Sequence, residues 1–297
     1  MPLRRSRTIA TLLILAFLVA GCAGFPKPGD DLRFDDGLGA EQWFERVMRA
    51  HGGDLSDDTR DFNLAMTGEW SSMIQRIQPL VSDADYRVSA EERYRPSDNL
   101  YAIRHAGPAG IKTVWRRGRD IRVWYDGEPV DDPDVLAATA MTTDAFELFH
   151  FGPSFLARRA VDMTRLKAGS DDGQSYPRLL FTIEPGFGRA ESDQVVAWID
   201  PDSHRLFRVH ITLNGFETTQ GAHVDTTFSG YVEQGGYWFP TTFEERVRGP
   251  IRIHAHDWRI TGRDLDRGWR PEDVEGPEFD GAAAAPAEAV IAGSGQN

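Results

Sequence analysis

Alternation of apolar and polar residues is the feature of this chain that most limits how it can fold. In the segment 205–213, Phe207, Val209, Ile211 and Leu213 alternate with Arg208, His210 and Thr212. Successive side chains of a strand point to opposite faces, so this period is typical of a half-buried antiparallel strand. Similar segments occur near residues 62–66, 86–94, 100–105, 111–116, 121–125, 179–184, 194–200, 224–233, 237–247 and 251–260.

Short stretches rich in Gly, Pro, Asp and Asn separate these segments, for example at residues 96–99, 200–203 and 234–236. Such residues favour turns, so the expected strands are joined by hairpins. About ten strands connected in this way form one antiparallel sheet, and a sheet of that width curls. The sequence therefore predicts a mainly β (α+β) protein in which a large curved antiparallel sheet forms an open half barrel.

One helix is expected before the first strand. Residues 40–50 carry apolar side chains at helical spacing, and Gly52 follows as a helix stop. His51 lies in the last turn, where a partial positive charge suits the helix dipole. We interpret His51 as a capping or packing residue rather than a catalytic one.

A second helical region interrupts the strands. Residues 134–160 are rich in Phe and Leu and are broken at Gly152-Pro153, so we expect two or three short helices. Their apolar faces need a cover, and the concave side of the sheet is the available surface. These helices either fill that side permanently as core or form a lid over a hydrophobic cleft. The residues predicted to line such a cavity and lid are Trp115, Tyr125, Phe146, Phe149, Phe151, Phe155, Val209 and Ile211.

The N-terminus has the three-part layout of a secretory signal. Three arginines within residues 4–7 precede the apolar run 9–20, and small residues lead to Cys22, the only cysteine of the chain. The run is too short for a membrane-spanning helix, which needs roughly 20 apolar residues. Residues 18–22 resemble a lipobox, in which Cys22 receives a diacylglyceryl group and becomes the first residue of the mature chain. The alternative is an ordinary signal peptide with an unmodified Cys22. Ala23 stands where an Asp would oppose sorting to the outer membrane, so we expect a lipid-anchored, periplasm-facing protein of that membrane.

This processing divides the chain into four expected parts: a signal peptide at 1–21, a flexible tether at 22–39, one domain at 40–275, and a disordered tail at 276–297 rich in Ala, Gly and Pro. Cleavage leaves 30 basic and 46 acidic residues, a formal charge near −16. Such a surface repels nucleic acid, so we expect no nucleic-acid partner. The expected partners are the membrane, through the lipid on Cys22, and a hydrophobic ligand or lipoprotein.

The chain lacks the local signatures of common enzymes. It contains no Gly-Xaa-Ser-Xaa-Gly elbow, phosphate-binding loop or His-Glu-Xaa-Xaa-His motif. His254 and His256 are two apart in an expected strand and would share a face, with His223 as a third metal ligand, but a solvated face is the commoner explanation. We therefore expect no catalytic activity, no metal and no cofactor.

Arg116, Arg117 and Arg119 form a compact basic cluster around an expected hairpin turn. A solvated turn is the simpler interpretation. Recognition of an anionic lipid headgroup is the alternative, and it would weaken as salt rises.

Several of these segments together resemble the LolA/LolB-like half-barrel superfamily of bacterial envelope proteins. They are the lipobox, the helix end Ala50-His51-Gly52-Gly53, the helical insertion, the hairpin at residues 196–209, and Gly235-Gly236-Tyr237-Trp238-Phe239-Pro240-Thr241. The resemblance covers residues 40–269. It implies a half barrel whose cavity accepts acyl chains or other hydrophobic cargo without a catalytic centre.

Three functions follow from these observations. The leading one is a lipid-anchored envelope protein that binds or receives a lipid, acyl chain or lipoprotein in its half-barrel cavity. The second is a structural or scaffold lipoprotein of the outer membrane whose concave face is filled by its own helices. The third, which the sequence supports least, is a hydrolase or metalloenzyme built on a sheet.

Overall fold

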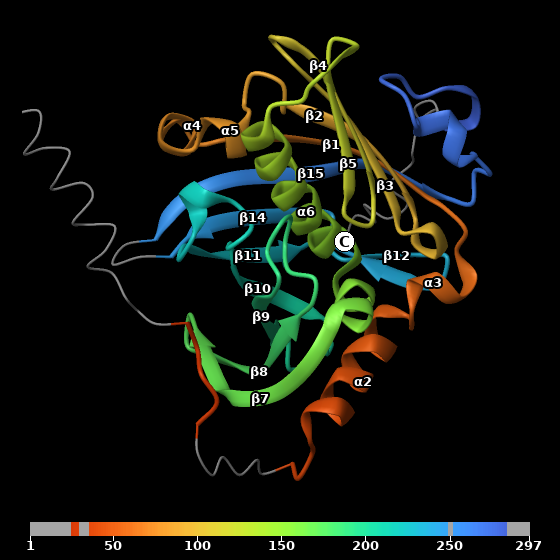
Figure 1. The fold of residues 1–297 in the computed structure, drawn as a ribbon. Helices are drawn as coiled ribbons and strands as arrows, with labels where there is room; N and C mark the ends of the chain where they lie inside the picture. Colours follow the sequence, from red (N-terminus) through yellow and green to blue (C-terminus); the bar gives the residue numbers. More distant parts are fainter. Residues whose placement is uncertain (1–24, 30–35, 249–251, 284–297) are drawn as a thin grey trace, which may run out of the picture.

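One open antiparallel sheet wraps around one long helix (Figure 1). This computed structural model describes residues 25–29, 36–248 and 252–283. The expected signal peptide and Cys22 lie outside the described residues. No helix in the described ranges is long and apolar enough to cross a membrane.

The sheet has thirteen strands in the order β6-β5-β4-β3-β2-β1-β15-β14-β11-β10-β9-β8-β7. Every neighbouring pair is antiparallel, as the alternation predicts. The strands are β1 (Phe62–Trp70), β2 (Ser89–Arg95), β3 (Leu100–Gly107), β4 (Gly110–Arg117), β5 (Asp120–Tyr125), β6 (Glu128–Pro129), β7 (Ala160–Asp171), β8 (Gln174–Ile183), β9 (Asp193–Ile199), β10 (Leu206–Thr212), β11 (His223–Ser229), β14 (Thr242–Val247) and β15 (Ile253–Leu265). A separate hairpin joins β12 (Val232–Gln234) to β13 (Tyr237–Phe239). The expected fold class, a large curved antiparallel sheet left open as a half barrel, is confirmed.

Strand β7 was not expected from the sequence. It is an edge strand that pairs only with β8, and its register shifts twice along that pairing. Its side chains are mostly exposed or half-buried, without regular alternation. Because β7 is an exposed edge strand with register shifts, its apolar and polar residues do not alternate regularly. Its sequence therefore does not predict a strand.

The helices are α2 (Ala40–His51), α3 (Leu55–Asp58), α4 (Ser72–Ile77), α5 (Pro79–Ser82) and α6 (Pro133–Arg159). Helix α2 ends where the sequence predicts, with Gly52 in a left-handed conformation (φ 103°). A Cβ atom at Gly52 would lie 2.1 Å from the carbonyl oxygen of Gly236, so only glycine lets α2 meet the turn between β12 and β13.

Helix α6 consists of two helical segments that meet at Gly152, where the sequence predicts the break, and the first segment is longer than expected. The first segment begins at Pro133, where the Asp132 side chain accepts hydrogen bonds from the backbone N–H groups of Asp134 and Val135. The only residue inside it with non-helical dihedral angles is Gly152 (φ 33°, ψ −105°), followed by Pro153. Helix α6 runs along the concave side of the sheet (Figure 1), which is the side on which the sequence places the insertion.

The folded region extends beyond the ends expected for the domain. Ala283 is fully buried in a small cluster with Trp269 and Val274 on the outer face of the sheet, although the tail was expected to begin at residue 276. At the other end, the Phe25 ring packs against His210, with 4.5 Å between ring centroids, inside the expected tether. A few apolar residues in Gly- and Pro-rich stretches make these contacts, and composition alone does not reveal them.

Candidate functional site

Helix α6 fills the concavity with aromatic side chains. Phe146, Phe149 and Phe155 are each at most 2% exposed. The Phe146 ring lies edge-on to Phe243 and Trp258, which come from the two central strands β14 and β15. Six of the eight residues predicted for the cavity and lid belong to this single core cluster: Phe146, Phe149, Phe151, Phe155, Val209 and Ile211.

The other two predicted residues do not join that cluster. Arg116, the neighbour of Trp115 on β4, pairs with α6, so Trp115 faces the outside of the sheet. It packs there with Trp269 under the C-terminal segment. Tyr125 lies near the end of β5, and its hydroxyl donates to the Asp83 carboxylate at 2.6 Å. The expectation that Trp115 shares a cavity with the phenylalanines is therefore corrected, because alternation separates apolar residues by face but cannot tell which face is concave. Tyr125 pairs with Lys112 and so lies on the same face as Arg116, but outside the phenylalanine cluster.

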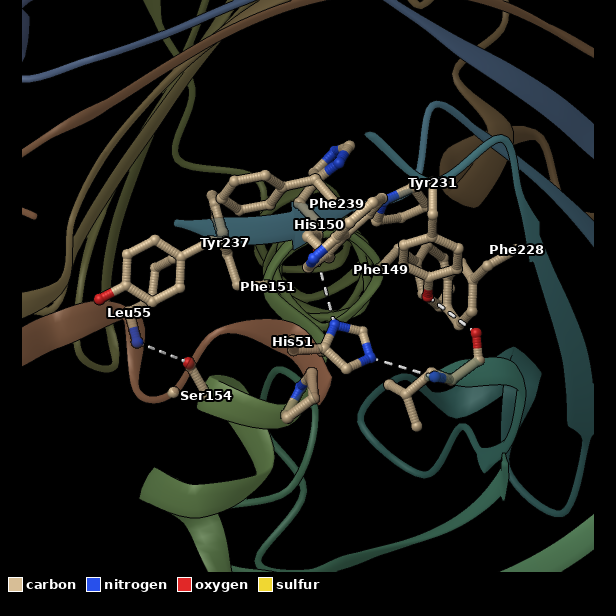
Figure 2. Close-up of a pocket in the computed structure, with 16 residues that line it drawn as sticks. His51, Leu55, Phe149, His150, Phe151, Ser154, Phe228, Tyr231, Tyr237 and Phe239 are labelled. Atoms are coloured by element: carbon tan, nitrogen blue, oxygen red, sulfur yellow. Dashed lines mark hydrogen bonds between the residues drawn. The ribbon is translucent and has the colours of Figure 1, made fainter. Parts of the chain in front are cut away.

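A small cavity lies where α6 is broken (Figure 2). Its volume is about 20 Å³, room for one water molecule. The break at Gly152 is packed tightly, since a Cβ atom there would lie 2.9 Å from the Leu206 side chain. The cavity is lined by His51, Gly53, Leu55, Phe149, His150, Phe151, Gly152, Pro153, Ser154, Leu206, Phe228, Tyr231, Tyr237, Trp238, Phe239 and Pro240. The lining is mainly apolar and combines α6, the end of α2 and the β12–β13 hairpin.

His51 joins three elements at one side of this cavity (Figure 2). Its Nε2 accepts a hydrogen bond from the backbone N–H of Leu206 at 3.0 Å. Its Nδ1 lies 3.2 Å from the Trp238 carbonyl oxygen and donates to it, because Nε2 is already the acceptor. Burial of the ring lowers the pKa of His51 to about 4. The neutral imidazole thus ties α2 to β10 and to the β12–β13 hairpin, which is the packing role expected from the sequence.

Buried ion pairs join the two segments of α6 across the break and hold both to β4. Glu147 is fully buried and pairs with Arg116 of β4, with Arg158 (2.6 Å) and with Arg159 (3.5 Å). Asp144 pairs with Arg116 and Arg159, each at 2.7 Å. Burial by itself would raise the pKa of Glu147, but the three guanidinium groups outweigh it and lower that pKa to about 2. The carboxylate is therefore charged at neutral pH.

A second cluster of buried polar side chains, besides the ion pairs of Glu147 and Asp144, lies between α6 and the sheet and was not predicted from the sequence. His150 lies with its Nε2 atom 3.2 Å from the Glu92 carboxylate on β2. The Tyr101 hydroxyl of β3 donates to the same carboxylate, and burial together with Glu92 raises the pKa of Tyr101. All three side chains are at most 3% exposed. These residues stand at positions 92, 101 and 150, too far apart in the sequence for a local motif to predict their contact.

The histidines considered as metal ligands lie on opposite faces of β15. Glu245 pairs with His256 and Arg246 pairs with His254, which leaves Ala255 as the extra residue of a bulge. His256 packs against Trp70 in the core, with 4.3 Å between ring centroids. The expectation that the two histidines share a face is wrong, because a bulge breaks the period of two.

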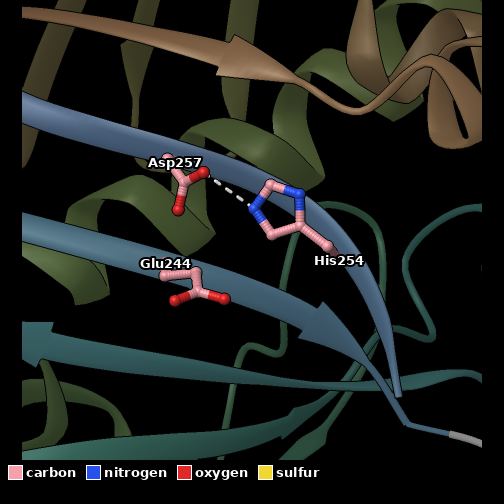
Figure 3. A group of neighbouring side chains, drawn as sticks. All are labelled: Glu244, His254 and Asp257. Atoms are coloured by element: carbon pink, nitrogen blue, oxygen red, sulfur yellow. Dashed lines mark ion pairs between the residues drawn. The ribbon is translucent and has the colours of Figure 1, made fainter. Parts of the chain in front are cut away.

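His254 instead faces outward beside Glu244 and Asp257 (Figure 3). Within the described residues, these three form a group whose ligand atoms lie within 4.8 Å of one another. His254 Nε2 is 2.8 Å from the Asp257 carboxylate, and Glu244 pairs with Arg246. All three side chains are more than a third exposed. The group is explained as a cluster of surface ion pairs.

No protein-family model matches the chain, and no curated protein matches it. Similar solved structures include a DUF1329 family protein from Desulfovibrio piger, at 15% identity and a TM-score of 0.47. A LolA superfamily protein from Nitrosomonas europaea matches at 11% identity and 0.47, and an outer membrane lipoprotein-sorting protein domain from Vibrio parahaemolyticus at 12% and 0.43. Each match covers 80% of this chain and 97% of the other. These likenesses concern the fold alone.

Proposed function

We propose that this chain is a lipid-anchored protein of the outer membrane, facing the periplasm, that takes a hydrophobic chain into the concave side of its half barrel. The observation that carries the proposal is the break of α6 at Gly152-Pro153, directly beside an apolar cavity. A helix interrupted by a glycine and a proline has two rigid halves that can change their relative angle. Movement at this point enlarges the space between α6, α2 and the β12–β13 hairpin.

The size of the cavity sets the mechanism. A volume of about 20 Å³ admits one water molecule and no acyl chain, so the described state is closed. A ligand must then displace part of α6 and replace its apolar contacts. Binding is a shift from this closed state toward an open one. The burial of the ligand's own apolar surface offsets the free-energy difference between the two states.

The small volume of the cavity also favours a second function, that of a structural lipoprotein. The phenylalanines of α6 are buried in one core cluster with residues of the sheet, as they would be in a structural lipoprotein that binds no cargo. The two functions differ in one property: only a binding protein carries a ligand that is released on unfolding.

Intact-mass measurements on the mature protein, purified from membranes in a neutral detergent, test both parts of the proposal. Under denaturing conditions we expect a chain that begins at Cys22 and carries the mass of covalent lipid. More than one acyl chain is needed for stable anchoring, because each buried methylene contributes about 0.8 kcal/mol. Under native conditions we expect an additional non-covalent lipid, which is lost when the protein unfolds.

The matched control is Cys22→Ser, which removes the attachment point and leaves the described fold unchanged. This variant should lack covalent lipid and still carry the non-covalent ligand. An unmodified Cys22 would disprove the anchor. A native mass without any ligand, in both proteins, would favour the structural lipoprotein instead.

A further inference from the structure

The two ends of the open sheet approach each other beside the C-terminal half of α6. Arg119, in the turn between β4 and β5, donates from Nη2 to the carbonyl oxygen of Ala190 at 2.9 Å. Ala190 belongs to the loop between β8 and β9, close to the other end of the sheet. Asp144 of α6 reaches the same loop, where its carboxylate accepts the backbone N–H of Gly188 at 2.6 Å.

A pocket of about 230 Å³ lies at this junction, and neither the fold nor the proposed lid explains it. Its charged lining consists of Arg116, Arg119, Arg158, Arg159 and Asp144. The floor is buried, because Arg116 and Arg159 are 2% and 7% exposed. The rim is open to solvent at Asn99, Arg119 and Pro185. A charged group can therefore enter from outside and reach buried guanidinium groups.

Positive charge exceeds negative charge in this pocket. Four guanidinium groups line it, and Asp144 together with Glu147 behind it supplies two carboxylates. Among the described residues, Arg119 pairs with no carboxylate, and the Nε atom of the buried Arg116 has no hydrogen-bond partner. The pocket therefore carries two more positive than negative charges, although the whole chain has a net charge of −13. Ion pairing inside the fold accounts for only part of this cluster.

We propose that this pocket binds a phosphate group. A guanidinium presents several N–H donors in one plane, which match the oxygens of phosphate, and partial burial strengthens each of these charge-assisted hydrogen bonds. The phosphate comes either from a lipid headgroup or from free phosphate. The lipid source rests on the proposed function, since it requires a chain in the half barrel; the free-phosphate source does not.

The structure revises the basic cluster expected from the sequence. Arg117 follows Arg116 on β4 and points to the opposite face, where it is exposed. Arg158 and Arg159, remote in sequence, take its place beside Arg116 and Arg119. Arg117 is therefore the natural control residue.

Calorimetric titrations of the full chain in a neutral detergent test the proposal. The probes are inorganic phosphate, dihexanoyl phosphatidic acid and dihexanoyl phosphatidylcholine, whose phosphate is masked by choline. We expect saturable binding of at least one of the first two, weaker at high salt. Arg119→Gln and Arg158→Gln should each weaken that binding about tenfold or more, and Arg117→Gln should leave it unchanged.

The pattern across probes identifies the source. Tighter binding of phosphatidic acid than of phosphate supports a lipid headgroup, and equal binding supports free phosphate. The Arg119 side chain is exposed, and within the part of the chain that the structure describes it pairs with no carboxylate, so Arg119→Gln remains informative even if Arg158→Gln fails to fold. The proposal is overturned if neither probe binds saturably, or if Arg119→Gln and Arg117→Gln bind alike. Loss of phosphate binding should leave the uptake of neutral apolar molecules unchanged. The phosphate pocket and the proposed hydrophobic-chain binding can therefore be disproved independently of each other.

Discussion

Replacing Glu147 by glutamine will lower the free energy of unfolding by about 3–5 kcal/mol, because it leaves buried guanidinium groups without their shared carboxylate. Glu147 is fully buried and pairs with Arg116, Arg158 and Arg159. Glutamine keeps the shape and loses the charge. Asp144 is then the only carboxylate paired with Arg116 and Arg159 among the described residues, Arg158 loses its carboxylate partner, and the repulsion among the three guanidinium groups adds to the loss.

Urea unfolding followed by circular dichroism measures this effect. The matched control is Glu128→Gln on β6, where the side chain is exposed and the expected change is within about 0.5 kcal/mol. Equal stability of Glu147→Gln and the parent protein would show that the ion pairs do not hold α6 in place.

Acidification from pH 6.5 to pH 4 will destabilise the protein through its buried histidines. Burial lowers the pKa of His51 to about 4 and that of His210 to about 2, and it lowers the pKa of His105 as well. Across this window the unfolded chain binds a proton at each histidine and the folded chain does not. Stability is therefore fully present above pH 6.5 and decreases as the pH falls. For His51, the difference between its pKa in the unfolded chain and its pKa in the folded protein corresponds to about 3 kcal/mol of unfolding free energy.

Buried carboxylates oppose part of this effect. Burial raises the pKa of Asp193 and of Asp225, so the folded state binds protons there more readily than the unfolded chain does. The test isolates one histidine: unfolding of the parent and of His51→Gln is compared at pH 7 and pH 5. The difference in unfolding free energy should shrink at the lower pH. Gln220→Ala, at an exposed side chain without an ionisable group, is the control and should show a constant difference. A constant difference for His51→Gln would refute a neutral, buried His51.

The sequence allows most of the sheet to be predicted, because a half-buried strand with a period of two is a local pattern. Strand β10 is the clearest example, and it lies at residues 206–212 against an expected 205–213. Strand β7 escapes prediction because its edge position removes the alternation. The bulge at Ala255 has no signature in the chain either, and it alone moves His254 away from His256.

The site is harder to predict than the fold, because its residues meet only in three dimensions. The phenylalanines of α6 are apparent from composition, and their burial follows from the need to cover a helix. The side of the sheet that each residue faces depends on the direction of curvature, so Trp115 was assigned to the wrong face. The partners of Glu147 are separated from it by 31, 11 and 12 residues along the chain. Only the helix arrangement brings them together.

If α6 moves at its break to admit a ligand, a covalent lock beside that break will prevent uptake. The backbone nitrogen of Leu55 lies 2.9 Å from Ser154 Oγ, beside the cavity, which places the two Cα atoms within about 7 Å, a distance that a disulfide spans. The lock is the pair Leu55→Cys and Ser154→Cys, built in a chain with Cys22→Ser so that no third thiol interferes. The control carries Ser154→Cys alone.

The measurement is the fluorescence of N-phenyl-1-naphthylamine, a neutral apolar probe, titrated into each protein with and without a reducing agent. We expect the oxidised lock to take up little probe. Reduction should restore uptake to the level of the control, and the control itself should be insensitive to redox conditions. Equal uptake by the oxidised and the reduced lock would contradict the movement of α6 at its break, and absence of uptake by every protein would leave the structural lipoprotein as the better description.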